Sequence, residues 1–156
     1  MTYGRKLVEG RTQEHAMNIL RSIVALTLLV LGTGVGAASK AAPENIPGSI
    51  RVNAEQLIDL YGNYPETVLI DSRTEEDFKR GYIEGAVNLP DTQTTPATLA
   101  RHASEKDRPV VFYCNGVNCG RSAVSAGLAV QWGYSKVFWF RGGIVEWREK
   151  RLPIVR

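Results

Sequence analysis

The sequence is poor in the residues that build disulfide scaffolds and metal sites. Its 156 residues include only two cysteines and two histidines, which excludes a disulfide-stapled fold and a four-cysteine zinc site. No internal repeat is visible along the chain. Hydrophobic residues make up 44% and charged residues 22%, so a wholly disordered chain is excluded as well. The length suits a single domain.

A strong excess of one charge is also missing from most of the chain. The formal net charge is +3. Residues 1–39 carry +2 of it, and residues 40–156 are almost neutral. A nearly neutral body offers no bulk electrostatic attraction for DNA, RNA or an anionic membrane. We therefore expect no nucleic-acid partner, and a membrane contact only through the N-terminal segment.

One long uncharged run lies in that segment. Residues 22–39 read SIVALTLLVLGTGVGAAS, follow Arg21 and end in small residues. This order is typical of a secretory signal peptide, so we expect residues 1–39 to be an export signal, with Met17 as an alternative start of translation. The alternative is an uncleaved membrane anchor, because 18 residues can just span a bilayer. The protein is therefore expected in the periplasm. If the segment is an anchor, the protein is expected in the membrane with its domain outside the cytoplasm.

The rest of the chain is predicted to be a linker, residues 40–49, followed by one α/β domain, residues 50–155. Two prolines and a glycine predict the linker. Short β-type runs alternate with helix-prone segments in the domain. This alternation predicts a mainly parallel central sheet flanked by helices on both faces. The strands are expected at 67–70, 86–89, 109–113 and 136–140, and the helices at 54–61, 75–80, 96–103, 122–132 and 144–150.

The residues with chemical potential gather in VVFYCNGVNCGRSAVSAGLAV. Cys114 is the first residue beyond a predicted strand, at the edge where open α/β sheets bind ligands. Gly116 and Gly120 permit positive φ angles, which would turn backbone N–H groups inward as an anion nest. The next helix and Arg121 add positive potential. These features favour a thiolate, so Cys114 is predicted to be a nucleophile; the alternative is an inert buried thiol.

Three segments together resemble a single-domain rhodanese. Residues 68–90, VLIDSRTEEDFKRGYIEGAVNLP, resemble the family's Asp-x-Arg, acidic helix and Gly-x-Ile-x-Gly-Ala pattern. The strand, loop and helix around Cys114 form the second segment. Residues 137–155, VFWFRGGIVEWREKRLPIV, are similar to the family's Gly-Gly-x-x-x-Trp ending. The three occur in order and cover nearly all of residues 50–155, so the resemblance implies a rhodanese-like α/β fold.

The resemblance also implies a sulfurtransferase that works through a persulfide on Cys114. A donor such as thiosulfate would supply the sulfane sulfur, and cyanide or a thiol would accept it. Asp71 and Arg73 match a pair near the family's site, although the residues themselves favour a structural ion pair. We expect no cofactor, and no metal, because His102 is the only histidine in the domain. The expected persulfide-binding loop is Asn115, Gly116, Val117, Asn118, Cys119, Gly120, Arg121 and Ser122.

The loop departs from the compact pattern Cys-Arg-x-Gly-x-Arg-Ser found in many family members. It reads CNGVNCGRS, which is longer by two residues, and Asn115 stands where an arginine is common. Tyr82 replaces the usual histidine of the Gly-His-Ile stretch. The preferred donor therefore stays open. A phosphatase is not expected, because six residues separate Cys114 from Arg121 where the signature of rhodanese-like phosphatases has five.

Cys119 is the second unusual feature of the loop, because it follows Cys114 by five residues. It either points passively into the helix start or bonds to Cys114. Our hypothesis is a readily reduced disulfide whose reduced form is the active sulfurtransferase. Two other functions remain open. One is a dithiol redox protein that uses both cysteines, and the other is a non-catalytic rhodanese-like module that senses sulfur species or binds a partner.

Overall fold

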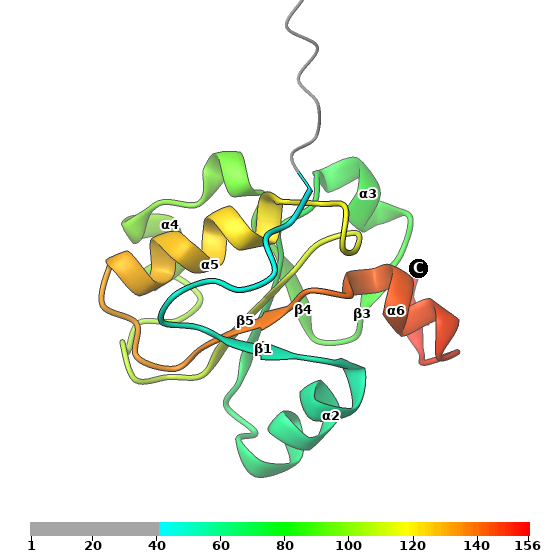
Figure 1. Ribbon diagram of the computed structural model, residues 1–156, viewed down its shortest axis with the longest axis horizontal. Helices are drawn as coiled ribbons and strands as arrows, with labels where there is room; N and C mark the ends of the chain where they lie inside the picture. Colours follow the sequence, from blue (N-terminus) through cyan, green and yellow to red (C-terminus); the bar gives the residue numbers. More distant parts are fainter. Residues whose placement is uncertain (1–40) are drawn as a thin grey trace, which may run out of the picture. The chain divides into compact units, whose positions relative to one another are not determined.

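Short runs of β-branched and aromatic residues form a five-stranded sheet in the computed structural model, which describes residues 41–156 (Figure 1). The strands lie in the order β1-β6-β5-β2-β4, and all neighbouring pairs are parallel. The central strand is buried at every residue, as its continuous apolar run predicts. The predicted parallel sheet is therefore confirmed. The strands are β1 (Ile50–Val52), β2 (Val68–Asp71), β4 (Ala86–Asn88), β5 (Val110–Tyr113) and β6 (Val137–Phe140).

Three of the strands were not predicted. The first is β1, whose three residues lie between the expected linker and the first helix. The others are β3 (Tyr82–Ile83) and β7 (Ile154–Val155), which pair antiparallel and join the C-terminus to the chain after α3 (Glu75–Lys79). Two or three residues are too few to show a period of two, so only the tertiary pairing identifies these strands.

The helices follow the predicted segments closely. An asparagine capping box starts α2, as predicted: the Asn53 side chain accepts a hydrogen bond from the Gln56 N–H, and the Gln56 side chain accepts one from the Asn53 N–H. Helix α4 is shorter than predicted and ends at Ala100, and a 3₁₀ turn, η1 (Asp91–Gln93), precedes it. The helices are α2 (Ala54–Asn63), α3, α4 (Pro96–Ala100), α5 (Arg121–Gln131) and α6 (Gly143–Glu149).

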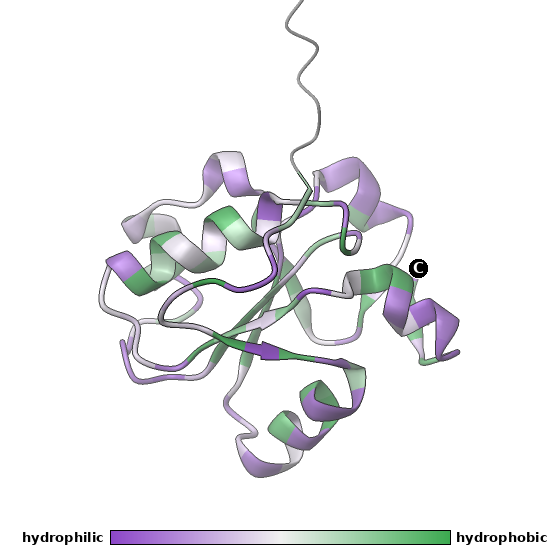
Figure 2. Ribbon diagram, in the orientation of Figure 1, coloured by the Kyte–Doolittle hydropathy of each residue, from purple (hydrophilic) through white to green (hydrophobic). Residues whose placement is uncertain are grey.

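Alternate residues of each strand face opposite sides of the sheet, and each side has its own core. On one side Ile70, Phe112 and Trp139 pack against α4 and α5. On the other side Leu69 and Phe140 pack against α2 and α6. Figure 2 shows the apolar residues on the strands and on parts of the helices, with polar residues between them. The prediction of helices on both faces is thus confirmed.

The segment predicted to be a linker packs on the domain over its described residues, 41–49. It has no helix or strand, but Ala42 and Ile46 are buried in the core beneath α5. The Ala42 N–H donates to the Val117 carbonyl oxygen at 3.2 Å. The Arg141 guanidinium holds the segment by an ion pair to the Glu44 carboxylate at 2.8 Å. These contacts make the segment part of the folded unit rather than a free connection.

The predicted export signal and the alternative start at Met17 lie outside the described residues. Within residues 41–156, no helix has the length and apolar character needed to cross a membrane.

Candidate active site

Cys114 follows β5 directly and lies at the carboxyl edge of the sheet, where the sequence places it. Its side chain is buried, with a residue exposure of 1%. The neighbouring strand β2 ends beside it, and the Ser72 N–H donates to the Tyr113 carbonyl oxygen at 2.9 Å. Ser72 is fully buried and its hydroxyl has no hydrogen-bond partner. No local sequence signal marks this serine, because it occupies the variable position of Asp-x-Arg.

The two cysteines of the loop are joined to each other. Cys114 and Cys119 form a disulfide across a Cα–Cα distance of 6.2 Å. The loop turns back on itself between them, and the Cys119 N–H donates to the Gly116 carbonyl oxygen at 2.9 Å. The bonded alternative for Cys119 is therefore the one found. In this state Cys114 has no thiolate, so it becomes a nucleophile only after a reductant opens the disulfide.

The start of α6 holds the loop from the other side. The Ile144 N–H donates to the Cys114 carbonyl oxygen, and the Val145 N–H donates to the Asn115 carbonyl oxygen, each at 3.0 Å. Gly143 has a φ of +56°, and a Cβ at this position would overlap the Cys114 carbonyl oxygen. Gly143 thus lets α6 approach the loop. The sequence predicts a tight turn at Gly142 and Gly143 and no contact with the loop; their place in Gly-Gly-x-x-x-Trp was the available signal.

The prediction that Gly116 and Gly120 build an anion nest through positive φ angles is wrong. Neither Gly116 nor Gly120 has a positive φ. Gly120 has φ −81° and ψ −6°, because it is the residue from which α5 begins. No side chain caps this helix start, so the N–H groups of its first turn have no side-chain acceptor and form an electropositive end next to the loop.

Arg121 was predicted to be a cation near the sulfur, but its guanidinium forms an ion pair with an acidic residue. Its guanidinium lies 3.8 Å from the Asp77 carboxylate of α3, and its side chain is 39% exposed. Ser122 is buried and accepts a hydrogen bond from the Trp139 indole N–H at 3.0 Å. Of the remaining predicted loop residues, two are exposed, Val117 and Asn118, and four are partly buried: Asn115, Gly116, Cys119 and Gly120.

Asp71 and Arg73 form a buried ion pair, as the residues themselves favoured. The Arg73 side chain donates to the Asp71 carboxylate at 2.5 to 3.0 Å, and its exposure is 3%. Burial alone would lower the pKa of Arg73, but the hydrogen bonds and the negative charge of Asp71 raise it above its usual range. Arg73 also donates to the Gly81 carbonyl oxygen at 2.9 Å. The pair thus fastens the chain after β2 to the chain after α3.

Tyr113 completes this buried group. Its hydroxyl accepts a hydrogen bond from the Ile83 N–H at 3.3 Å. Burial raises the pKa of the Tyr113 phenol, and the Asp71 carboxylate raises it further. The phenol is therefore neutral at physiological pH. Because Tyr113 precedes Cys114, the group anchors the strand end that carries the nucleophile.

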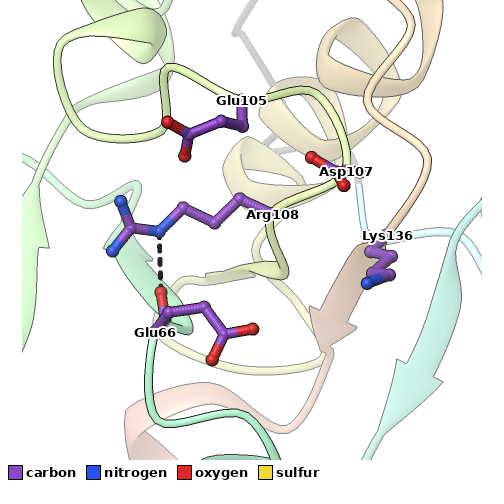
Figure 3. A pocket seen from close by; sticks show the side chains of 5 residues that line it. All are labelled: Glu66, Glu105, Asp107, Arg108 and Lys136. Carbon is purple, nitrogen blue, oxygen red and sulfur yellow. Dashed lines mark hydrogen bonds between the residues drawn. The ribbon is translucent and has the colours of Figure 1, made fainter.

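A surface pocket lies at the opposite end of the strands (Figure 3). Its side chains come from the loops that lead into β2, β5 and β6. The Arg108 Nε donates to the Glu66 carbonyl oxygen at 2.8 Å. Three acidic and two basic side chains line the pocket: Glu66, Glu105, Asp107, Arg108 and Lys136. The pocket holds none of the predicted site residues, and no group of three or more metal-ligating residues converges anywhere in residues 41–156.

Two curated proteins and one solved structure are similar to this chain over most of the described residues. The chain is 33% identical over 104 residues to a sulfurtransferase of Allochromatium vinosum, covering 67% of this chain and 92% of that protein. It is 28% identical over 134 residues to the protein YibN of Escherichia coli K12, covering 85% and 86% respectively. Among solved structures, the BH2092 protein of Bacillus halodurans matches with a TM-score of 0.60 and 25% identity, over 69% of this chain and 77% of that chain.

The residues that carry the sequence pattern and the fold also match a family model. The family model that describes the rhodanese-like domain matches residues 53–150, which include four of the five strands of the sheet, the helices on both faces and the whole cysteine loop. The Asp-x-Arg pair, the loop cysteine and the Gly-Gly turn lie in the matched part. The chain therefore belongs to the rhodanese-like domain family.

Proposed function

We propose that this protein is a sulfurtransferase that carries a sulfane sulfur as a persulfide on Cys114. One observation supports it above all: Cys114 stands at the carboxyl end of β5, next to the uncapped start of α5, inside a rhodanese-like domain. The Allochromatium vinosum relative is named a sulfurtransferase. A helix start stabilises an anion in the reduced enzyme, whether thiolate or persulfide.

The reaction begins with reduction of the disulfide. Two equivalents of a small thiol convert the Cys114–Cys119 disulfide into two thiols and form one disulfide of the reductant. The Cys114 thiolate then attacks the sulfane sulfur of thiosulfate. The sulfur–sulfur bond of thiosulfate breaks, sulfite leaves with the electron pair, and Cys114 carries the persulfide. Cyanide attacks the terminal sulfur, which gives thiocyanate and restores the thiolate.

Mass spectrometry of the full chain tests this proposal. The reduced protein should gain one sulfur atom, about 32 Da, from thiosulfate, and alkylation should locate that sulfur on Cys114. The Cys114 thiol should also react with the alkylating reagent below the usual cysteine pKa of about 8.5. The Cys114→Ser variant should gain none, while Cys119→Ser should gain it without prior reduction. Sulfur uptake by Cys114→Ser would refute the mechanism.

A second candidate function follows from the disulfide itself. A Cys114–Cys119 pair is able to cycle between dithiol and disulfide and oxidise or reduce a partner thiol. Replacement of Cys119 separates the two functions, because Cys119→Ser retains sulfur uptake but has no disulfide cycle. If Cys119→Ser loses sulfur transfer together with thiol oxidation, the dithiol function replaces the sulfurtransferase. We propose that the domain works outside the cytoplasm, where such a disulfide persists.

A further inference from the structure

One buried hydroxyl next to the cysteine loop has no hydrogen-bond partner. Within residues 41–156, two buried side-chain oxygens lack one, the hydroxyls of Ser72 and Tyr61. Ser72 has 0% exposure. A buried hydroxyl without a partner costs free energy, so such a group in a folded protein calls for an explanation.

The strand register places this hydroxyl beside the nucleophile. Asp71 of β2 is opposite Tyr113 of β5, and the Ser72 N–H donates to the Tyr113 carbonyl oxygen at 2.9 Å. The pairing therefore continues by one residue and sets Ser72 opposite Cys114. Neighbouring strands lie about 4.8 Å apart.

Both side chains also lie on the same side of the sheet. Ile70 and Phe112 share one core, beneath α5. Ser72 and Cys114 follow these residues by two positions, and side chains two positions apart point to the same face. Ser72 and Cys114 are both buried, so the alternation places the hydroxyl and the sulfur on the same buried side of the sheet.

We propose that the Ser72 hydroxyl is a hydrogen-bond donor to the Cys114 sulfur in the reduced protein, so that it stabilises the thiolate and then the persulfide anion. In the oxidised form the Cys114 sulfur is bonded to Cys119, and no hydrogen bond joins it to the hydroxyl. Reduction creates an anionic sulfur, and a hydrogen bond to an anion is about twice as strong as a neutral one. The inference deepens the proposed function, since it concerns the same nucleophile.

The charged groups around the loop are already occupied with other partners. Arg121 at the start of α5 lies against Asp77 of α3, and Asp71 after β2 is paired with Arg73. The Glu146 carboxylate of α6 accepts a hydrogen bond from the Ala54 N–H at 2.9 Å. Arg141, after β6, is bound to the Glu44 carboxylate. These charged groups therefore already have partners, whereas the Ser72 hydroxyl has none.

The test measures the pKa of the Cys114 thiol without any sulfur donor. In the reduced full chain with Cys119→Ser, iodoacetamide reports a single thiol, and its alkylation rate is followed from pH 4 to 10. Adding Ser72→Ala should raise the midpoint by about one pH unit, which is a roughly tenfold loss of thiolate at low pH. The matched control is Tyr61→Phe, which removes the other unpartnered hydroxyl and should leave the midpoint unchanged.

A second measurement separates this role from a structural one. In the oxidised protein, Ser72→Ala should leave the urea midpoint of unfolding unchanged or raise it, because no hydrogen bond is lost. An unchanged thiol midpoint in Ser72→Ala, an equal shift in Tyr61→Phe, or a clear fall in oxidised stability would each overturn the inference. Failure of the sulfurtransferase proposal looks different: the thiol midpoint moves as expected, but the protein takes up no sulfur from thiosulfate.

Discussion

Replacing Gly143 by alanine tests whether the close approach of α6 holds the cysteine loop. Gly143 has a φ of +56°, and its added Cβ would overlap the Cys114 carbonyl oxygen and press on the Asn115 backbone. A left-handed conformation costs a non-glycine residue about 1–2 kcal/mol. Relief of the overlap would break the two 3.0 Å hydrogen bonds from α6 to the loop, at about 0.5–1.5 kcal/mol each. Gly143→Ala should therefore lower the free energy of unfolding by about 2–5 kcal/mol.

Two other glycines serve as controls in the same urea titration. Gly133 has a φ of +86°, but a Cβ there would meet no atom within 4 Å, so Gly133→Ala should cost only the conformational part, about 1–2 kcal/mol. Gly62, inside α2, also has open space and has no positive φ. Gly62→Ala should stabilise the protein by about 0.5–1 kcal/mol.

Sulfur uptake from thiosulfate adds a functional measurement to these three variants. Gly143→Ala displaces the backbone next to Cys114, so uptake by the reduced protein should fall, while Gly133→Ala and Gly62→Ala should take up sulfur at the wild-type rate. If Gly143→Ala costs no more stability than Gly133→Ala, the overlap with the loop is relieved without loss, and the account of α6 as its support is refuted.

Two further predictions concern buried titratable groups. Arg73→Ala leaves the Asp71 carboxylate buried without its cation, so the free energy of unfolding should fall by about 3–5 kcal/mol. The control is Arg51→Ala, which breaks the exposed pair with Glu44 and should change the free energy of unfolding by less than about 1 kcal/mol. Equal effects of the two variants in urea titrations would contradict this reasoning. Burial raises the pKa of Tyr61 to about 12 from an ordinary value near 10, so between these pH values the unfolded chain loses the proton first and stability falls as pH rises. The fall should be smaller in Tyr61→Phe, and identical alkaline titrations of the two proteins would show that the phenol does not contribute.

The elements that depend on local pattern could be predicted from the sequence. The apolar run before Cys114 predicted a buried parallel strand, and the capping box at Asn53 predicted the start of α2; both are found. These signals are local, because burial of a strand and satisfaction of helix N–H groups depend on residues close in the chain. The same reasoning placed Cys114 at the carboxyl edge of the sheet, and the spacing of Cys119 made the disulfide a definite hypothesis.

The surroundings of the sulfur depend on contacts between distant parts of the chain, and no local pattern predicted them. The nest of Gly116 and Gly120 was wrong because φ depends on how the loop joins α5 and α6, and the left-handed glycine is instead Gly143, 29 positions after Cys114. The register between β2 and β5 brings Ser72 beside Cys114 across more than forty residues of sequence, and no local pattern reports such a pairing. The packing of Ala42 against the loop could not be predicted for the same reason. The prolines around it are typical of a linker, and its partner Val117 lies 75 positions further along the chain.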